Sequence, residues 1–168
     1  MAREKYCPQC SKGLIVFDEG GAERLGCPDK ECGYVFWGNP TPVVGAIVEL
    51  NGEIILARNA NWPEGQFGLI TGFLEHGEVP ENAVLREVEE ELGLYGEIEN
   101  YIGHYMFKQM NQLIMVWHIQ AQGEVKLDAE LAEVKYVLPE ELRPWRYGTG
   151  PAVRDWLDGR YWVQIEDR

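Results

Sequence analysis

The 168-residue sequence predicts an α/β or α+β sandwich with a small cysteine-rich unit at its N-terminus. Short runs rich in β-branched residues alternate with a few segments of helical periodicity, as in layered folds that combine strands and helices. All four cysteines lie within residues 7–32. The hydrophobic fraction of 45% is sufficient for a folded core. We therefore expect two parts, a small unit at residues 1–37 and a larger domain at residues 38–168.

The cysteines form two pairs, Cys7 with Cys10 and Cys27 with Cys32, separated by two and by four residues. Between the pairs, residues 13–25 predict a hairpin with a DEGG turn. Two cysteine pairs at the ends of a hairpin indicate a zinc ribbon, in which four thiolates hold a structural Zn²⁺. Disulfides or a redox pair are the alternatives. Disulfides are disfavoured in a cytosolic chain, and a redox pair does not account for all four thiols.

The larger part follows a linker, residues 37–42, in which two prolines and a glycine disfavour regular structure. Two apolar runs then flank Asn51-Gly52, a dipeptide typical of a two-residue hairpin turn. The predicted strands are 43–50, 53–58, 67–74 (a strand or a turn), 101–108, 113–120 and 134–138. Two short helices are predicted at 139–142 and 151–157.

A longer helix is predicted at residues 80–92. Its apolar residues form one buried stripe, at Val84, Leu85, Val88 and Leu92. Pro80 suits the first helical turn, where its missing N–H costs nothing, and Gly93 suits the position just after the last turn.

This helix also carries three glutamates on one face, since Glu90 and Glu91 follow Glu87 by three and four residues. Like charges at that spacing destabilise an isolated helix by about 0.2–0.5 kcal/mol per pair. A hard divalent cation such as Mg²⁺ would neutralise the patch, because it prefers carboxylate and phosphate oxygens. The alternative is a solvated acidic helix face, which the run EVEEEL alone would favour.

The surrounding residues decide between these interpretations. Residues 72–94 read GFLEHGEVPENAVLREVEEELGL and resemble the Nudix box, a pattern with nine specified positions. The matching residues are Gly72, Glu78, Arg86, Glu87, Val88, Glu90, Glu91, Gly93 and Leu94. The resemblance implies the Nudix α/β/α sandwich. It also implies an enzyme that uses Mg²⁺ or Mn²⁺ to hydrolyse a pyrophosphate bond in a nucleoside diphosphate linked to another moiety, such as an ADP-ribose-like or dinucleotide compound.

The same resemblance assigns roles within the box. It implies that Glu87 and Glu91 are metal ligands and that Glu90 is a further one, with a general base among the three left open. It pairs Glu78 with Arg86, a pair that orients the helix. Thr71, beside a glycine that permits close approach, is expected to turn a backbone carbonyl toward the metal.

The order of ribbon, proline-containing linker and Nudix domain is similar to the NADH pyrophosphatase branch of the family. In that comparison Glu130 completes the metal site, with a solvated strand-edge glutamate as the alternative. Ala152 corresponds to a residue whose backbone contacts substrate. However, residues 103–117 lack the branch's Ser-Gln-Pro-Trp-Pro-Phe-Pro motif, so NADH or NAD is the second substrate hypothesis.

Single residues outside the box are candidates for substrate contacts. Phe107, Tyr105 or Trp62 is suited to stack a base, although each is more often a core or surface aromatic residue. Arg58 and Lys108 are candidates for binding phosphate, with plain solvent exposure as the alternative.

The formal net charge of −13 argues against passive attraction to nucleic acid or to anionic membranes. Neither a membrane-spanning run nor a signal peptide is recognisable, so a cytoplasmic location is expected. The competing hypothesis is a binding module that senses nucleotides and uses the ribbon to recruit nucleic acid or protein. The resemblance also suggests a homodimer.

Overall fold

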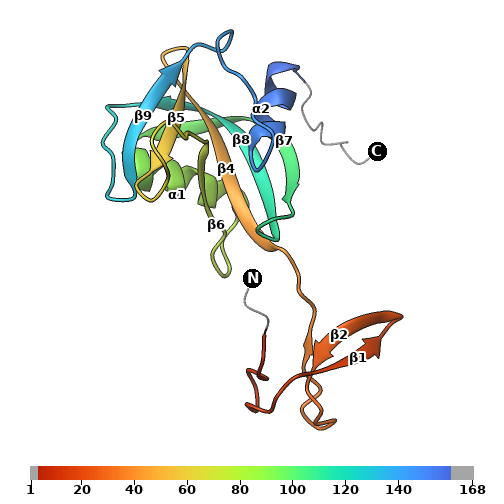
Figure 1. The fold of residues 1–168 in the computed structure, drawn as a ribbon. Helices are drawn as coiled ribbons and strands as arrows, with labels where there is room; N and C mark the ends of the chain where they lie inside the picture. Colours follow the sequence, from red (N-terminus) through yellow and green to blue (C-terminus); the bar gives the residue numbers. More distant parts are fainter. Residues whose placement is uncertain (1–3, 160–168) are drawn as a thin grey trace, which may run out of the picture. The chain divides into compact units, whose positions relative to one another are not determined.

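The computed structural model of the protein describes residues 4–159. The chain divides into two compact units between Pro40 and Thr41. The first contains the strands β1 (Ile15–Glu19), β2 (Ala22–Gly26) and β3 (Val35–Phe36). The second contains β4 (Thr41–Leu50), β5 (Glu53–Asn59), β6 (Ile70–Phe73), α1 (Pro80–Leu92), β7 (Tyr95–Phe107), β8 (Gln112–Gln122), β9 (Leu131–Val137) and α2 (Gly150–Leu157) (Figure 1). None of the described helices is long and apolar enough to span a membrane.

The first unit is a three-stranded antiparallel sheet in the order β1-β2-β3. Its predicted hairpin is confirmed, and Gly20 and Gly21 take φ angles of 64° and 80° in the turn. Gly26 leaves room for an aromatic ring, because a Cβ there would lie 2.2 Å from Cε1 of Phe17. The third strand was not predicted, since two residues give no periodic signal.

The second unit is built on a six-stranded mixed sheet in which β4 is central. The main strand order is β7-β8-β4-β5-β9, with only β4 and β8 parallel. One edge of β4 is shared, because its first half pairs with β6 and its second half with β5. The predicted turn at Asn51-Gly52 is confirmed, with φ angles of 54° and 85°. Because β6 pairs with the first half of β4, it lies next to α1.

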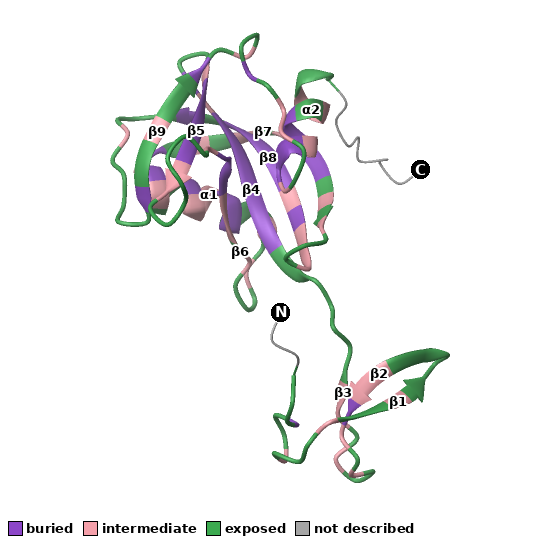
Figure 2. Cartoon of the chain, viewed as in Figure 1, coloured by how far each residue is buried: buried purple, intermediate pink, exposed green. Residues whose placement is uncertain are grey.

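Helices cover both faces of this sheet. Alternate residues of β4 point to opposite faces, so Val44, Ala46 and Val48 join a core beneath α1. Val43 and Ile47 join a second core that includes Ala152 and Val153 of α2. Figure 2 shows β4 as a nearly continuous buried strand. The predicted α/β sandwich is therefore confirmed.

Strands β4 and β9 begin two and three residues before the predicted strands, so β4 includes the last two residues of the predicted linker. Two other predicted elements differ more from the structure. Residues 139–142 form a single turn closed by Leu142 N–H to Leu138 O at 3.0 Å, not a helix. Pro144 disfavours helical φ/ψ at Arg143, so the turn does not continue. Strand β7 begins at Tyr95, six residues before the predicted strand. Its first part contains glutamates and bulges rather than a β-branched run, so its pattern was missed.

The buried face of α1 gives a direct test of the packing. We expect Leu92→Ala to lower the free energy of unfolding by about 2–5 kcal/mol, because Leu92 is fully buried and its removal leaves a cavity. The exposed Leu157 in α2 provides the matched control, and Leu157→Ala should change stability by about 0.5 kcal/mol or less. Urea denaturation of the full-length variants measures both, and equal effects would contradict the described core.

Candidate active site

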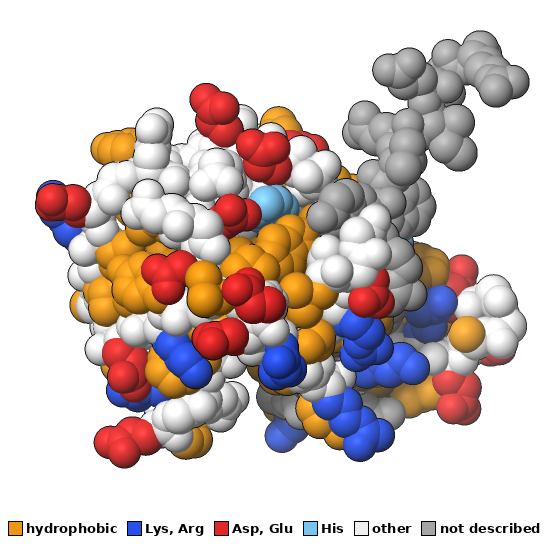
Figure 3. All heavy atoms as spheres, turned by 90° about the horizontal axis from the view of Figure 1, so that it is seen from above, with side chains coloured by type: hydrophobic (Ala, Val, Ile, Leu, Met, Phe, Trp, Pro, Cys, Tyr) orange, Lys and Arg blue, Asp and Glu red, His pale blue; other side chains and the backbone are white. Residues whose placement is uncertain are grey.

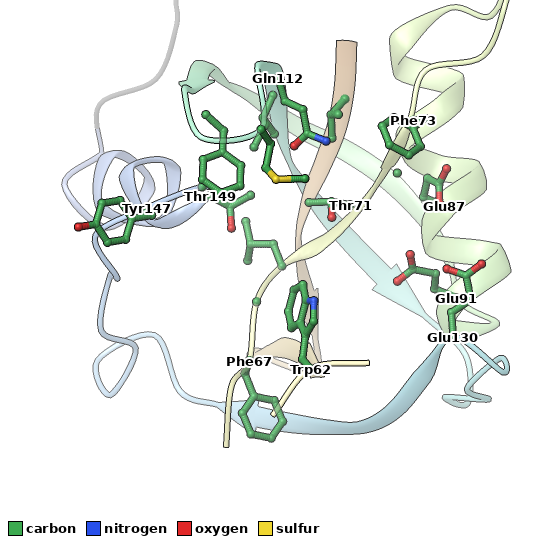
Figure 4. A pocket seen from close by; sticks show the side chains of 18 of the residues that line it. Trp62, Phe67, Thr71, Phe73, Glu87, Glu91, Gln112, Glu130, Tyr147 and Thr149 are labelled. Carbon is green, nitrogen blue, oxygen red and sulfur yellow. The ribbon is translucent and has the colours of Figure 1, made fainter. Parts of the chain in front are cut away.

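The second unit contains an open cavity of about 1070 Å³ beside α1 and β6. Figure 4 shows the carboxylates of Glu87, Glu91 and Glu130 together on one wall. Aromatic side chains, among them Trp62 and Tyr147, line other parts of the cavity. One wall is therefore suited to cations, and the remainder is suited to flat, partly apolar groups.

Arg86 organises the acidic wall. Its Nε and Nη2 atoms donate to the two carboxylate oxygens of Glu78, at 2.8 and 3.0 Å. Its Nη1 atom donates to Glu87 at 2.8 Å and to Glu90 at 2.9 Å. Nη2 also donates to the carbonyl oxygen of Phe73 in β6, at 3.3 Å. These five bonds match the five N–H donors of a guanidinium, so the group is fully satisfied.

Gly72 lets β6 approach the helix at the position of Glu87. A Cβ at Gly72 would lie 1.8 Å from Cδ of Glu87 and 1.9 Å from its Oε1. The Glu87 carboxyl group thus occupies space that any other residue at position 72 would fill. The glycine of the motif is explained by this close contact, and Thr71 beside it also lines the cavity.

Glu130 reaches the wall from the segment between β8 and β9. The backbone N–H groups of Lys126 and Asp128 donate to Leu92 O at 2.8 Å and Glu91 O at 3.2 Å. These bonds satisfy carbonyls that the end of α1 would otherwise leave unpaired. Asp128 Oδ1 then accepts the backbone N–H of Glu130 at 2.7 Å. The segment therefore fixes Glu130 relative to the end of the helix.

Burial and mutual repulsion disfavour the ionised form of two carboxyl groups at the site. Burial raises the pKa of Glu91 to about 8 from an ordinary value of 4.5, and repulsion by Glu87, Glu130, Asp128 and Glu90 adds to the shift. Burial also raises the pKa of Glu87, against the opposing effect of Arg86. In contrast, hydrogen bonds from Arg86 lower the pKa of Glu78. The carboxyl groups of Glu87 and Glu91 are thus costly to ionise, whereas that of Glu78 is not.

The helix dipole adds to this cost. Glu90 and Glu91 lie in the last turn of α1, where the dipole is negative, and no basic residue occupies that turn. Oxygen donors crowded in this way fit a hard divalent cation, which would replace the repulsion with attraction. Glu87, Glu91 and Glu130 could hold Mg²⁺ or Mn²⁺. Glu90 is more exposed, at 57%, and is bonded to Arg86.

The four predicted cysteine ligands also lie together, in the first unit. All four sulfur atoms lie within 4.8 Å of one another, with Cys7 to Cys32 at 3.6 Å and Cys10 to Cys27 at 3.4 Å. Sulfurs around a tetrahedral Zn²⁺ with bonds of about 2.3 Å are separated by about 3.8 Å. The cysteines are unpaired by disulfides and fit a zinc site.

The other predicted contact residues have different environments. Phe107 and Trp62 line the cavity. Arg58 does not, because its Nε atom donates to Glu133 Oε1 at 2.6 Å. Ala152 is fully buried in the core beneath α2, and Lys108 is exposed away from the cavity lining.

Tyr105 donates a hydrogen bond to Asp155 Oδ2 at 2.9 Å. Residues that the sequence did not single out also line the cavity, among them Glu75, Trp145 and Tyr147. Glu75 lies within the motif but at an unspecified position. Trp145 and Tyr147 lie in a segment rich in Pro and Gly. Their closeness in the sequence is the one signal that could have identified them as lining residues.

Residues 39–157 match the family model described as the NUDIX domain, which covers more than half of the chain. The chain belongs to the Nudix family, as the motif predicted.

Among its relatives are proteins named NAD-capped RNA hydrolases. One from Homo sapiens is 28% identical over 151 residues, or 84% of this chain and 32% of that protein. One from Vibrio parahaemolyticus is 28% identical over 142 residues, or 83% of this chain and 53% of that protein. The chain thus spans about half or less of the length of these relatives. A solved structure titled as a NUDIX hydrolase from Nitrosomonas europaea has a TM-score of 0.78 and 25% identity, covering 94% of this chain and 92% of that one.

The raised pKa of Glu91 predicts a pH dependence of stability in buffer without magnesium or manganese. Between about pH 4.5 and 8 the carboxyl group ionises in the unfolded chain but stays protonated in the folded one, so stability falls as pH rises through this window. Glu91→Gln removes the ionisable group and with it this decrease in the free energy of unfolding at high pH. We expect the variant to be more stable than the wild type at pH 9, by a margin that shrinks toward pH 5.

Urea denaturation at several pH values measures this difference. Glu89→Gln, an exposed change on the same helix, is the control and should not show the trend. A Glu91→Gln margin independent of pH would contradict the proposed crowding.

Proposed function

We propose that this protein uses Mg²⁺ or Mn²⁺ to hydrolyse the pyrophosphate bond of a nucleoside diphosphate linked to a second moiety. The observation that carries the proposal is the convergence of Glu87, Glu91 and Glu130 on one wall of the cavity. The raised pKa values of Glu87 and Glu91, and the position of Glu91 in the last turn of α1, are unfavourable for stability unless cations bind there.

The chemistry divides between cations and side chains. When bound, divalent cations would neutralise phosphate oxygens and lower the pKa of an attacking water. Glu87, Glu91 and Glu130 would hold them, and Arg86 would keep Glu87 and Glu90 in place. Thr71 stays a proposed backbone ligand. One of the glutamates on this wall would accept the proton from water, as the reaction requires.

We place the substrate among ADP-ribose-like and dinucleotide compounds, with NAD or NADH as the second candidate. The support is the chemistry of the cavity, where aromatic side chains accompany the acidic wall, and the names of the relatives, which refer to NAD-capped RNA. A cavity of about 1070 Å³ has room for a group on each side of a pyrophosphate.

The formal net charge of −13 repels the many phosphates of an RNA, so we expect small nucleotides to bind in preference to free RNA. Figure 3 shows acidic side chains spread over the face in view, with hydrophobic side chains between them and Lys and Arg side chains gathered in its lower part. The proposal also includes a structural Zn²⁺ in the first unit and a homodimer. It includes a cytoplasmic location, where thiols stay reduced.

Neutralising single carboxylates tests the proposed chemistry. We expect Glu87→Gln, Glu91→Gln and Glu130→Gln each to lower kcat/KM by about 100-fold or more, because each removes a metal ligand and even supporting residues contribute about 10–100-fold. A substrate panel with ADP-ribose, NAD and NADH, assayed with and without Mg²⁺, measures this. Glu89→Gln is the matched control. Full activity in all three variants would disprove the assignment.

The contact between Gly72 and Glu87 yields a separate prediction. Gly72→Ala should lower kcat/KM by about 10-fold or more, because the new methyl group displaces the Glu87 carboxyl group. Stability should change little, since the displaced atoms end a flexible side chain. Gly45→Ala on the adjoining strand is the control, because a Cβ there meets only ordinary contacts of 3.4–3.5 Å. Thermal unfolding and kinetics separate the two effects, and an active Gly72→Ala enzyme would contradict the geometry.

A further inference from the structure

Trp62 lies in the segment between β5 and β6 and lines the same cavity as the acidic wall. Figure 4 shows its indole among the side chains that line the cavity. The residue is 37% exposed, although a tryptophan is among the largest apolar side chains. Its ring therefore contributes a flat surface to the cavity rather than to either core.

The ring packs against the backbone at Gly68. A Cβ at Gly68 would lie 3.2 Å from Cη2 and Cζ3 of Trp62, so the indole packs closely against the Gly68 backbone and a side chain there would press on it. Gly68 is itself held rigidly, because it exchanges two hydrogen bonds of 2.9 Å with Ala57 of β5. Pairing with β5 thus fixes the backbone at Gly68 next to the indole.

The backbone of Trp62 is fixed as well. Its N–H donates to Asn59 O at 2.9 Å, and its carbonyl oxygen accepts from Arg58 Nη1 at 3.2 Å. The Arg58 guanidinium is held in turn by Glu133 of β9, at 2.6 Å, and its side chain is only 15% exposed. An ion pair between two strands therefore helps to hold the backbone of this loop at Trp62.

We infer that Trp62 is the stacking platform for a nucleobase, or a similar flat heterocycle, of the substrate, and that Arg58 is its positioning residue. The inference rests on the proposed function and deepens it. A preorganised aromatic face loses little entropy when a ring stacks on it, and stacking tolerates different bases because each has a π-face. The role of Arg58 is thereby assigned to the loop rather than to phosphate.

Kinetics on two kinds of substrate test this inference. Trp62→Ala should raise KM for ADP-ribose and NAD roughly 5- to 150-fold, the range expected for one lost base–aromatic stack, with a smaller effect on kcat. KM for a diribosyl diphosphate, which has the pyrophosphate but no base, should change far less. Trp62→Phe should restore most of the loss. Tyr95→Ala, which removes an exposed aromatic residue outside the cavity lining, is the matched control.

The positioning role is tested alongside. Arg58→Ala and Glu133→Gln should raise KM for the base-containing substrates in the same direction by a smaller factor, and Arg58→Lys should restore part of it. A purely structural role would instead lower the thermal midpoint and reduce activity equally on both kinds of substrate.

The outcomes separate this inference from the proposed function. If Trp62→Ala leaves KM for ADP-ribose and NAD unchanged, or raises KM equally for the base-free diphosphate, the platform is wrong while hydrolysis stands. If the wild type hydrolyses none of these compounds, the proposed function fails. Calorimetric titration with ADP-ribose then decides the inference: binding weakened by Trp62→Ala supports it, and equal binding or no wild-type binding overturns it.

Discussion

The acidic wall depends on a single guanidinium group. Arg86 uses all five N–H donors on three carboxylates and one backbone carbonyl, and so joins the segment before α1, the helix itself and β6. Glu78 serves this arrangement rather than the cavity, because it is committed to a two-bond pair with Arg86. Removing the guanidinium would release the carboxylates from a fixed geometry and leave them to repel one another.

The site is assembled where local rules of stability are violated. Acidic residues crowd the negative end of α1, and the carboxyl of Glu91 is buried among others of its kind. Such a cluster is stable only because the rest of the unit packs well, with two cores on either side of β4. Conflict of this kind is typical of sites that complete their charge balance by binding a cation.

Local sequence signals predicted the elements with local causes. The bounds of α1 follow from Pro80 at its start, Gly93 after its end and the apolar stripe between them, and all three can be recognised in the sequence. The same holds for the turn at Asn51-Gly52. The resemblance to the Nudix box brought Glu87, Glu90 and Glu91 to attention, and the structure explains the glycine of the motif by its contact with Glu87.

Non-local pairing could not be foreseen in the same way. From the sequence, Arg58 was a candidate for binding phosphate. Strand pairing places it beside Glu133, which is 75 residues further along the chain. Ala152 depends on how α2 packs, which single-sequence periodicity does not reveal. The early part of β7 was missed because its bulges break the alternation on which strand prediction relies. The metal and substrate roles themselves stay predictions.

The segment that ends α1 has a consequence for how the chain tolerates changes of length. Between Lys126 and Glu130, backbone bonds to two helix carbonyls and one side-chain bond fix the spacing residue by residue. An insertion there would rotate Glu130 away from the wall. Extra residues just after β8 would instead be accommodated as a longer exposed bulge. Insertions and deletions among related chains should therefore occur directly after β8, and the stretch from Lys126 to Glu130 should keep its length.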